Sequence, residues 1–138
     1  MTGAHLLLNP ETMMPAVGFS HAVVAAPGRT VYLGGQTSHG PDGRSTGETT
    51  AEQFDAALDN VVAALEAAGA RPEHLVSMQI FVTDAAEYRR SRRELGESYR
   101  RRFGKHYPAM ALFEIKGLYD PASKVELMCI AVIPETTS

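Results

Sequence analysis

The segment from Val125 to Ile133 constrains the fold most, because it is apolar at nearly every position. Successive side chains of an extended strand point to opposite faces of a sheet. One face of this strand would carry Val125, Leu127, Cys129 and Ala131, and the other Glu126, Met128, Ile130 and Val132. An apolar strand of this kind is typical of a sheet that is buried on both faces. Whatever else the chain forms, both faces of this strand need a cover.

The remaining elements follow from apolar periodicity and turn residues. Two apolar runs flank the dipeptide Pro27-Gly28, which favours a turn, and they predict a hairpin. In chain order we expect strands at 20–26 and 30–36, a helix between Thr49 and Gly69, a strand at 73–83, a helix at 85–103, strands at 109–115 and 125–133, and a further short strand at 6–8. The order β-β-α-β-α-β-β predicts a single α+β domain spanning residues 1–138.

Polar residues mark the helix ends, and alternation assigns the strand faces. Thr49 with Glu52 predicts a capping box, Asp84 with Glu87 repeats that arrangement, and Gly69 is placed as a C-terminal cap. In the strand at 73–83, alternation puts Val76, Met78, Ile80 and Val82 on one face, and Leu75 and Phe81 on the other.

The two helices can cover only one face of such a sheet. The second face needs a partner, and another copy of the same chain is the simplest one. We therefore expect a homo-oligomer. The alternative is that the N-terminal segment folds across the open face.

Length and composition exclude several classes of protein. The 138 residues suffice for one domain, and they contain no apolar run of the roughly 18 residues that a membrane span needs. Residues 1–15 do not resemble a signal peptide, and the single cysteine, Cys129, cannot form an internal disulfide. A net charge of −3 does not indicate a nucleic-acid binder. We expect a small, soluble, cytoplasmic protein.

No metal or cofactor site is predicted. The five histidines lack the spacings of zinc sites, and the glycines between Gly34 and Gly43 form no phosphate-binding motif. Cys129 lies mid-strand among apolar residues, where burial raises the pKa of a thiol and makes it unreactive.

Seven arginines crowd the second expected helix: Arg89, Arg90, Arg92, Arg93, Arg100, Arg101 and Arg102. A basic stripe of this kind could bind phosphates. Glutamates interleave with the arginines at spacings that allow ion pairs within the helix, so we interpret the stripe as a solvated helix face.

Glu126 is the strongest candidate for chemistry. Its strand neighbours on the same face are apolar, and desolvation raises the pKa of a carboxyl group. Such a group can act as a general base or position a water. The alternative is an exposed residue at the start of the strand, partnered by Lys124.

Several segments together resemble one family. Gly18-Phe19-Ser20-His21-Ala22 is similar to its G-x-[YF]-S-x-A opening, and residues 31–36 to its v-y-v-S-G-Q strand end. Further matching residues are Gln53, Asn60, Leu65, Gly69, Tyr99, Phe103, Pro108, Ala109, Val125 and Glu126. The chain is thereby identified as a member of the RidA family, also called YjgF/YER057c-like, over about Gly18 to Ile133.

The resemblance implies a chorismate-mutase-like fold and a homotrimer with ligand pockets between neighbouring subunits. RidA proteins hydrolyse reactive enamines and imines, such as 2-aminoacrylate and 2-iminobutanoate, to 2-oxo acids and ammonia without a cofactor. In that scheme an arginine binds the substrate carboxylate, while backbone groups and a glutamate guide a water. Glu126 matches the glutamate, so the resemblance implies that Glu126 is catalytic.

The chain departs from the family pattern within the motifs themselves. Met110 replaces the arginine of the P-A-R motif, and Phe19 replaces a tyrosine. Gly34 stands for the serine before G-Q, and Gly96 for the asparagine before Y-x-x-x-F. Charge-assisted hydrogen bonds from arginine to a carboxylate are worth about 1.5–3 kcal/mol each, and methionine forms none. We therefore expect 2-imino-acid deaminase activity to be weak or absent.

The leading hypothesis is a diverged, cofactor-independent hydrolase that acts on a small imine, enamine or other less anionic metabolite. Phe19, Met110 and Leu112 would shape an apolar slot, and Glu126 would be the general base or water-orienting group.

Other residues would supply the polar contacts of this site. Backbone N–H groups near Met110 and at Gly34-Gly35 would polarise the reacting bond, as in an oxyanion hole. His21 or His39 would replace the lost side-chain contacts. The alternatives are a non-catalytic protein that binds a metabolite or partner through the same cleft and, with the arginines alone in its favour, an RNA-directed activity.

Overall fold

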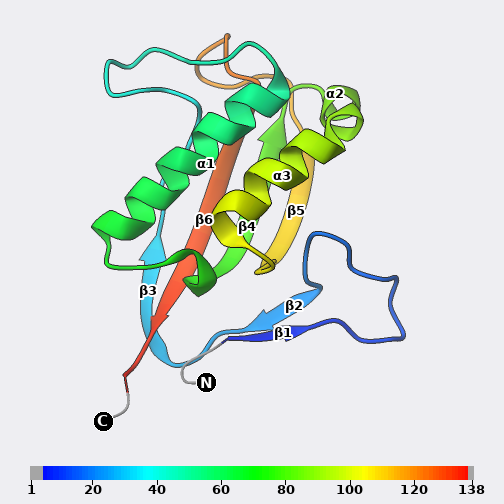
Figure 1. The fold of residues 1–138 in the computed structure, drawn as a ribbon, viewed down its shortest axis with the longest axis vertical. Helices are drawn as coiled ribbons and strands as arrows, with labels where there is room; N and C mark the ends of the chain where they lie inside the picture. The colour runs from blue at the N-terminus through cyan, green and yellow to red at the C-terminus, as the bar shows by residue number, and fades with distance from the viewer. Residues whose placement is uncertain (1–4, 137–138) are drawn as a thin grey trace.

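The computed structural model describes residues 5–136 as one layer of helices on one layer of strands (Figure 1). The strands are β1 (Leu6–Leu8), β2 (Ala22–Val24), β3 (Gly28–Tyr32), β4 (Leu75–Val82), β5 (Ala109–Glu114) and β6 (Val125–Pro134). The helices are α1 (Thr50–Ala67), α2 (Ala85–Arg90), α3 (Arg92–Phe103) and the short 3-10 helix η1 (Pro72–His74). The predicted order of elements is confirmed; residues 1–4 and 137–138 of the expected domain lie outside the described range.

A mixed four-stranded sheet with the strand order β3-β6-β4-β5 forms the centre of the molecule. β4 and β5 run parallel, and the other pairs are antiparallel. Figure 1 shows α1 and α3 side by side on one face of this sheet. The α+β class and the single layer of helices agree with the sequence-based expectation.

The capping box at the start of α1 is confirmed. The Thr49 hydroxyl accepts a hydrogen bond from the N–H of Glu52, and the Glu52 carboxylate accepts one from the N–H of Thr49. At the other end Ala68 is the cap residue, and Gly69 follows it with φ 79°, a conformation that favours glycine. These contacts fix the length of the helix that covers β6.

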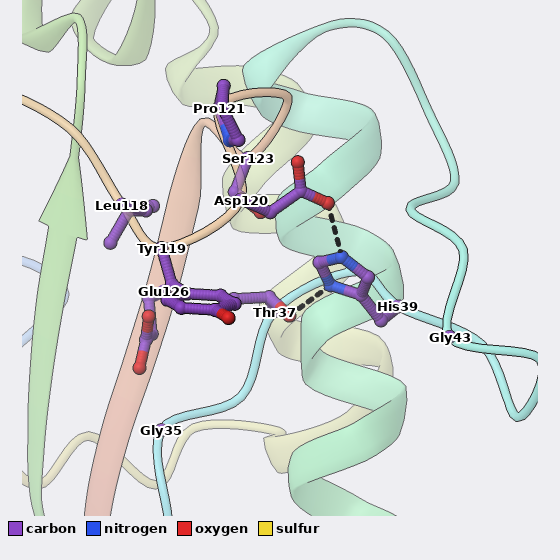
Figure 2. A pocket seen from close by; sticks show the side chains of 10 residues that line it. All are labelled: Gly35, Thr37, His39, Gly43, Leu118, Tyr119, Asp120, Pro121, Ser123 and Glu126. Carbon is purple, nitrogen blue, oxygen red and sulfur yellow. Dashed lines mark hydrogen bonds and ion pairs between the residues drawn. The ribbon is translucent and has the colours of Figure 1, made fainter.

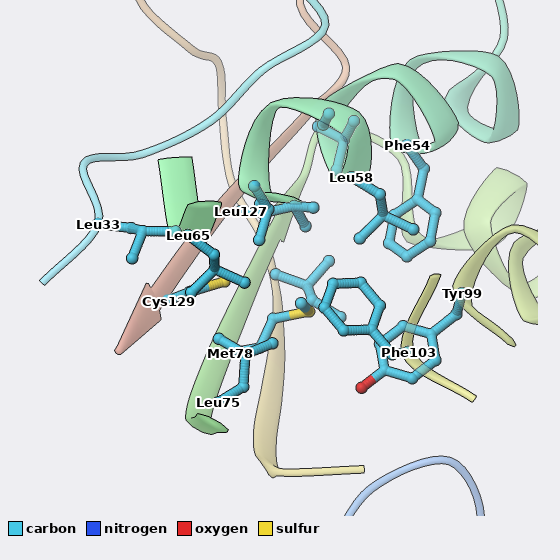
Figure 3. Close-up of a cluster of buried hydrophobic side chains, with 14 of the residues drawn as sticks. Leu33, Phe54, Leu58, Leu65, Leu75, Met78, Tyr99, Phe103, Leu127 and Cys129 are labelled. Atoms are coloured by element: carbon cyan, nitrogen blue, oxygen red, sulfur yellow. The ribbon is translucent and has the colours of Figure 1, made fainter. Parts of the chain in front are cut away.

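The core lies between α1, α3 and the inner face of β6 (Figure 3). Val125, Leu127, Cys129 and Ala131 are at most 1% exposed, as alternation predicts. On the opposite face of the strand, Met128 remains 43% exposed. β6 therefore separates a closed core from an open sheet face.

The expected hairpin of residues 20–26 and 30–36 is wrong. β2 pairs with β1 in a separate two-stranded sheet, whereas β3 pairs with β6. Gly28 begins β3 opposite Pro134, and a Cβ at this position would overlap the backbone of Ile133. The dipeptide Pro27-Gly28 thus marks the passage between two sheets, and its glycine is required for close approach to β6.

Within residues 5–136 the N-terminal segment reaches one end of the open face, where His5 bonds the carbonyl of the buried Val132 at 3.0 Å, but it leaves much of that face uncovered. Met128 and Phe113, at 43% and 44%, keep much of their side-chain surface exposed in the single chain. Residues 5–26 therefore do not cover the part of this face around Met128 and Phe113, as the alternative of an N-terminal cover would require.

The start of β4 breaks the regular alternation. Its pairing with β6 shifts register between Leu75 and Ser77, as in a β-bulge. Leu75 is fully buried together with Met78, while Val76 is only half-buried. The expectation that Val76 shares a face with Met78, and Leu75 with Phe81, is wrong because the extra residue reverses the phase of the strand.

The second expected helix is interrupted at Ser91, which separates α2 from α3. The Ser91 hydroxyl donates to the carbonyl of Glu87 at 2.9 Å, and the Ser91 N–H bonds the carbonyl of Tyr88, only three residues back. A serine that bonds the preceding turn in this way bends a helix. Asp84 caps α2 as expected, because its carboxylate accepts from the N–H of Glu87, but the Glu87 carboxylate accepts from the N–H of Thr50 and so does not complete a capping box.

Ion pairs connect the arginine-rich helix α3 to α1. Arg102 lies 2.9 Å from both Asp55 and Asp59 on α1. The expected ion pairs within the helix do not form among the described residues, and Glu87 lies instead 3.6 Å from Lys124. Six of the seven arginines remain exposed as a solvated face: Arg89, Arg90, Arg92, Arg93, Arg100 and Arg101.

We predict that Asp55→Asn lowers the free energy of unfolding by about 1 kcal/mol at pH 7. Burial opposes ionisation, but hydrogen bonds from Arg102 and Ser98 hold the pKa of Asp55 below its ordinary value of 3.8. A lowered folded-state pKa stabilises the fold only while the carboxyl is ionised. The difference in the free energy of unfolding between wild type and Asp55→Asn should therefore be full above pH 3.8. It should disappear as the pH falls through the lower folded-state pKa of Asp55.

Denaturant titrations at several pH values measure this difference. Asp59→Asn is the matched control, because its side chain is 70% exposed and should contribute less. Equal losses in both variants, or a loss at Asp55 that does not change with pH, would contradict the assignment.

Candidate functional site

An open cavity of about 810 Å³ lies between two loops near the start of β6 (Figure 2). Gly35, Thr37, His39 and Gly43 line it from the segment that follows β3. Leu118, Tyr119, Asp120, Pro121 and Ser123 line it from the loop that precedes β6, and Glu126 comes from β6 itself. The predicted catalytic residue is thus part of a concave site lined by both polar and apolar residues.

The position of Glu126 follows from strand geometry. It lies opposite Phe81 of β4, on the face of the sheet away from the helices. Beyond β3, Gln36 exchanges two backbone hydrogen bonds of 2.8 Å with Leu127, which brings Gly35 beside Glu126. A Cβ at position 35 would overlap the Glu126 carboxylate, so the glycine provides the space that this carboxylate occupies.

Two amide side chains of α1 hold the loops that bound the cavity. Asn60 donates to the carbonyls of Thr37 and His39 at 2.8 and 2.9 Å. Gln53 donates to the carbonyl of Ala122 at 3.0 Å, and its amide oxygen accepts from the N–H of Lys124 at 2.7 Å. Both residues belong to the matched family pattern, and the structure shows what they do: they fasten both walls to one helix.

A second group of predicted residues lies beside β5. Ser20 forms a parallel bridge with Ala109, and this pairing places Phe19 next to the start of β5. Phe19 contacts His21 edge-on, with ring centroids 5.1 Å apart. The His21 ring bonds the carbonyl of Met14 at 2.8 Å, so it holds the loop between β1 and β2. Of the two histidines considered, His39 lines the cavity with Glu126.

Met110 and Leu112 lie opposite Met78 and Ile80 of β4, and Met110 packs partly against the core. Gly96 lies on α3, and a Cβ there would come within 2.9 Å of the Arg100 guanidinium. The missing side chain at position 96 therefore leaves room for an arginine that lies across the helix.

Within one chain the two groups do not meet. Glu126 shares the face of Phe81, whereas Met110 shares the opposite face of β4 with Met78. The strands that carry them are separated by β4, a distance of roughly 10 Å across the sheet. The roles predicted for Phe19, His21, Gly34, Gly35, Gly96, Met110, Leu112 and Glu126 stay predictions.

The cavity also contains residues that sequence reasoning missed. Thr37, Asp120 and Ser123 supply polar groups, and the Tyr119 side chain is fully exposed. They lie in two irregular loops where no motif or periodicity marks them. Cys129 lies outside the site, in the core, and burial raises the pKa of its thiol to about 12, in agreement with an unreactive cysteine.

Comparisons with known proteins agree on one family. The family model for endoribonuclease L-PSP matches residues 10–133. The RutC family protein UK114 of Drosophila melanogaster is 31% identical over 129 residues, which are 92% of this chain and 88% of that protein. No helix within residues 5–136 has the length and apolar character required to cross a membrane.

Solved structures show the same fold. The Rid family protein YyfB of Yersinia pestis, a protein of unknown function, has a TM-score of 0.84 at 27% identity, with 94% of this chain and 98% of that chain covered. A Mycobacterium tuberculosis member of the YjgF/YER057c/UK114 family has a TM-score of 0.62 at 30% identity, covering 94% of this chain and all of that one, 100%.

We predict that Gly35→Ala displaces the Glu126 carboxylate without unfolding the protein. The new methyl group would overlap a flexible side-chain end, so the carboxylate should rotate away and the free energy of unfolding should change by about 1 kcal/mol or less. Gly34→Ala is the matched control, since a Cβ there meets nothing within 4 Å. Crystal structures of both variants measure the effect; an unmoved Glu126 in Gly35→Ala would contradict the packing described.

Proposed function

The chain belongs to the endoribonuclease L-PSP family, which is the RidA/YjgF family of the sequence resemblance, and from this we propose that it hydrolyses small imines or enamines without a cofactor. Its architecture is the chorismate-mutase-like fold of that family. Membership supports a Rid-type deaminase or a related small-molecule activity at the level of the family. The substrate preference proposed below rests on this chain's own residues.

The observation that carries the proposal is the location of Glu126. Glu126 lines a cavity of about 810 Å³ together with the polar residues Thr37, His39 and Asp120, and its carboxylate lies against Gly35. A carboxylate in this position can accept a proton from a water as the water attacks the carbon of a C=N bond. The backbone N–H groups at Gly34-Gly35 would polarise the reacting bond.

We propose that the complete site is shared by neighbouring chains of a homotrimer. Two observations support this assembly: the apolar sheet face stays open in the single chain, and the predicted residues fall into two groups that one chain keeps apart. A neighbour on the open face would bring its Phe19 and Met110 towards Glu126. The assembly would also cover exposed side chains such as Met128 and Phe113.

Met110 determines the proposed substrate class. A thioether cannot form the charge-assisted hydrogen bonds with which arginine binds a carboxylate. An adaptable apolar side chain favours instead an uncharged alkyl or aryl substituent on the imine carbon. We therefore assign the protein to uncharged imines, with 2-imino acids as poor substrates. A non-catalytic ligand-binding protein of the same fold is the alternative that the following experiment separates.

We predict that the protein accelerates hydrolysis of an uncharged aldimine, generated in the assay by an amine oxidase, while it has little effect on 2-iminopropanoate. Competition with semicarbazide, which traps the remaining imine, measures both rates. Glu126→Gln should lower kcat for the aldimine by about 10²–10⁴-fold and leave KM nearly unchanged, because it removes the base but keeps the shape.

Glu135→Gln is the matched control, because Glu135 is an exposed residue just beyond β6 and should retain full activity. Turnover of 2-iminopropanoate comparable to that of an arginine-bearing relative would contradict the role given to Met110. Binding of the aldimine's product without acceleration would favour the non-catalytic alternative.

A further inference from the structure

Three polar side chains on the cavity wall, Thr37, His39 and Asp120, are joined in a hydrogen-bonded series (Figure 2). The Thr37 hydroxyl lies 2.6 Å from Nδ1 of His39, and Nε2 of His39 lies 2.7 Å from Oδ2 of Asp120. All three residues line the same cavity as Glu126. Asp120 is about eighty residues from the other two in the sequence, so only the fold brings these three side chains together.

Hydrogen bonds to the backbone fix both ends of this series of side chains. Asn60 fixes the backbone of Thr37 and His39 through their carbonyls, and the N–H of Ala122 donates to Asp120 at 2.9 Å. His39 and Asp120 expose about a quarter and a third of their side chains, 25% and 35%. Such anchoring keeps the imidazole in one orientation, as a proton-transfer group requires.

The direction of these hydrogen bonds follows from the charge of Asp120. The N–H of Ala122 and the His39 ring hold the pKa of Asp120 below its ordinary value, so the carboxylate is ionised at neutral pH and can only accept. Nε2 of His39 must then carry a hydrogen. In the neutral ring Nδ1 accepts from the Thr37 hydroxyl, and in the protonated ring Nδ1 donates to it.

Resting on the proposed function, we propose that Thr37, His39 and Asp120 form a proton relay that protonates the departing nitrogen, opposite the water activated by Glu126. In this proposal Thr37 is the catalytic residue of the relay, because it lines the cavity and stands at the end of the series away from Asp120. His39 supplies the proton to Thr37, and Asp120 is a positioning residue that fixes the ring, as the carboxylate does in a serine–histidine–aspartate triad.

The steps balance for an imine with uncharged substituents on carbon that has taken up a proton at nitrogen from the solvent before water adds. Water adds to the carbon while Glu126 takes one of its protons, and the C=N electron pair moves to nitrogen. The amine nitrogen takes the Thr37 hydroxyl proton, and Nδ1 of His39, whose ring enters this step protonated on both nitrogens, gives its proton to Thr37. The C–N bond then breaks, the carbinol O–H proton returns to His39 through Thr37, and the Glu126 proton leaves with the amine.

The test compares Thr37→Val, which replaces the hydroxyl by a methyl group of similar size, with Thr37→Ser, which keeps the hydroxyl. In the aldimine assay we expect Thr37→Val to lower kcat by about 10²-fold or more with KM within about threefold, and Thr37→Ser to restore most of it. His39→Gln should match Thr37→Val, and Asp120→Asn should lower kcat less, because it disturbs only the orientation of the ring.

Asp42→Asn, in the same loop but outside the cavity lining, is the charge control and should keep full kcat. Active wild-type protein whose Thr37→Val and His39→Gln variants keep wild-type kcat would overturn the relay and leave the proposed function standing. Wild-type protein that accelerates no aldimine would overturn both, because the relay would then have no reaction to serve. Equal losses of kcat in Thr37→Val and Thr37→Ser would also overturn the relay, because the packing of the side chain rather than its hydroxyl would then be responsible.

Discussion

The two-residue alternation along β6 is the constraint on which the rest of the structure depends. Val125, Leu127 and Cys129 face the helices and are buried, so the residues between them must face the open side of the sheet. A slip of one residue would exchange the two sets and expose the core. Glu126 is therefore held on the open face by the burial of its neighbours, and the site has the rigidity of the core strand.

The helix α1 connects the core to the walls of the site. Its apolar stripe packs on β6, while Gln53 and Asn60, on the same helix, bind the backbone of the two loops around the cavity. Each amide makes at least two hydrogen bonds to loop backbone, and buried amides without partners would be costly. The same helix that closes the core thus fixes the distance between Glu126 on the sheet and the Thr37–His39–Asp120 chain on the loops.

The sequence predicts the elements that depend on periodicity and misses those that depend on pairing. The capping box at Thr49, the core face of β6 and the place of Glu126 follow from spacing alone, and the family from its scattered motifs. The bulge at Val76 and the exchange of the expected hairpin for two sheets depend on long-range pairing that alternation does not encode. Asp120 meets His39 because two irregular loops are tied to one helix.

The central claim is that a complete site requires two chains, with Glu126 from one and Phe19 and Met110 from the next. A crystal structure of the assembled protein tests this most directly, because it shows which side chains face each Glu126. The account predicts a trimer of 14.9 kDa chains in which the neighbour's Met110 and Phe19 close the cavity around Glu126. A monomer, or an assembly that leaves each cavity facing solvent with Met110 elsewhere, would contradict it.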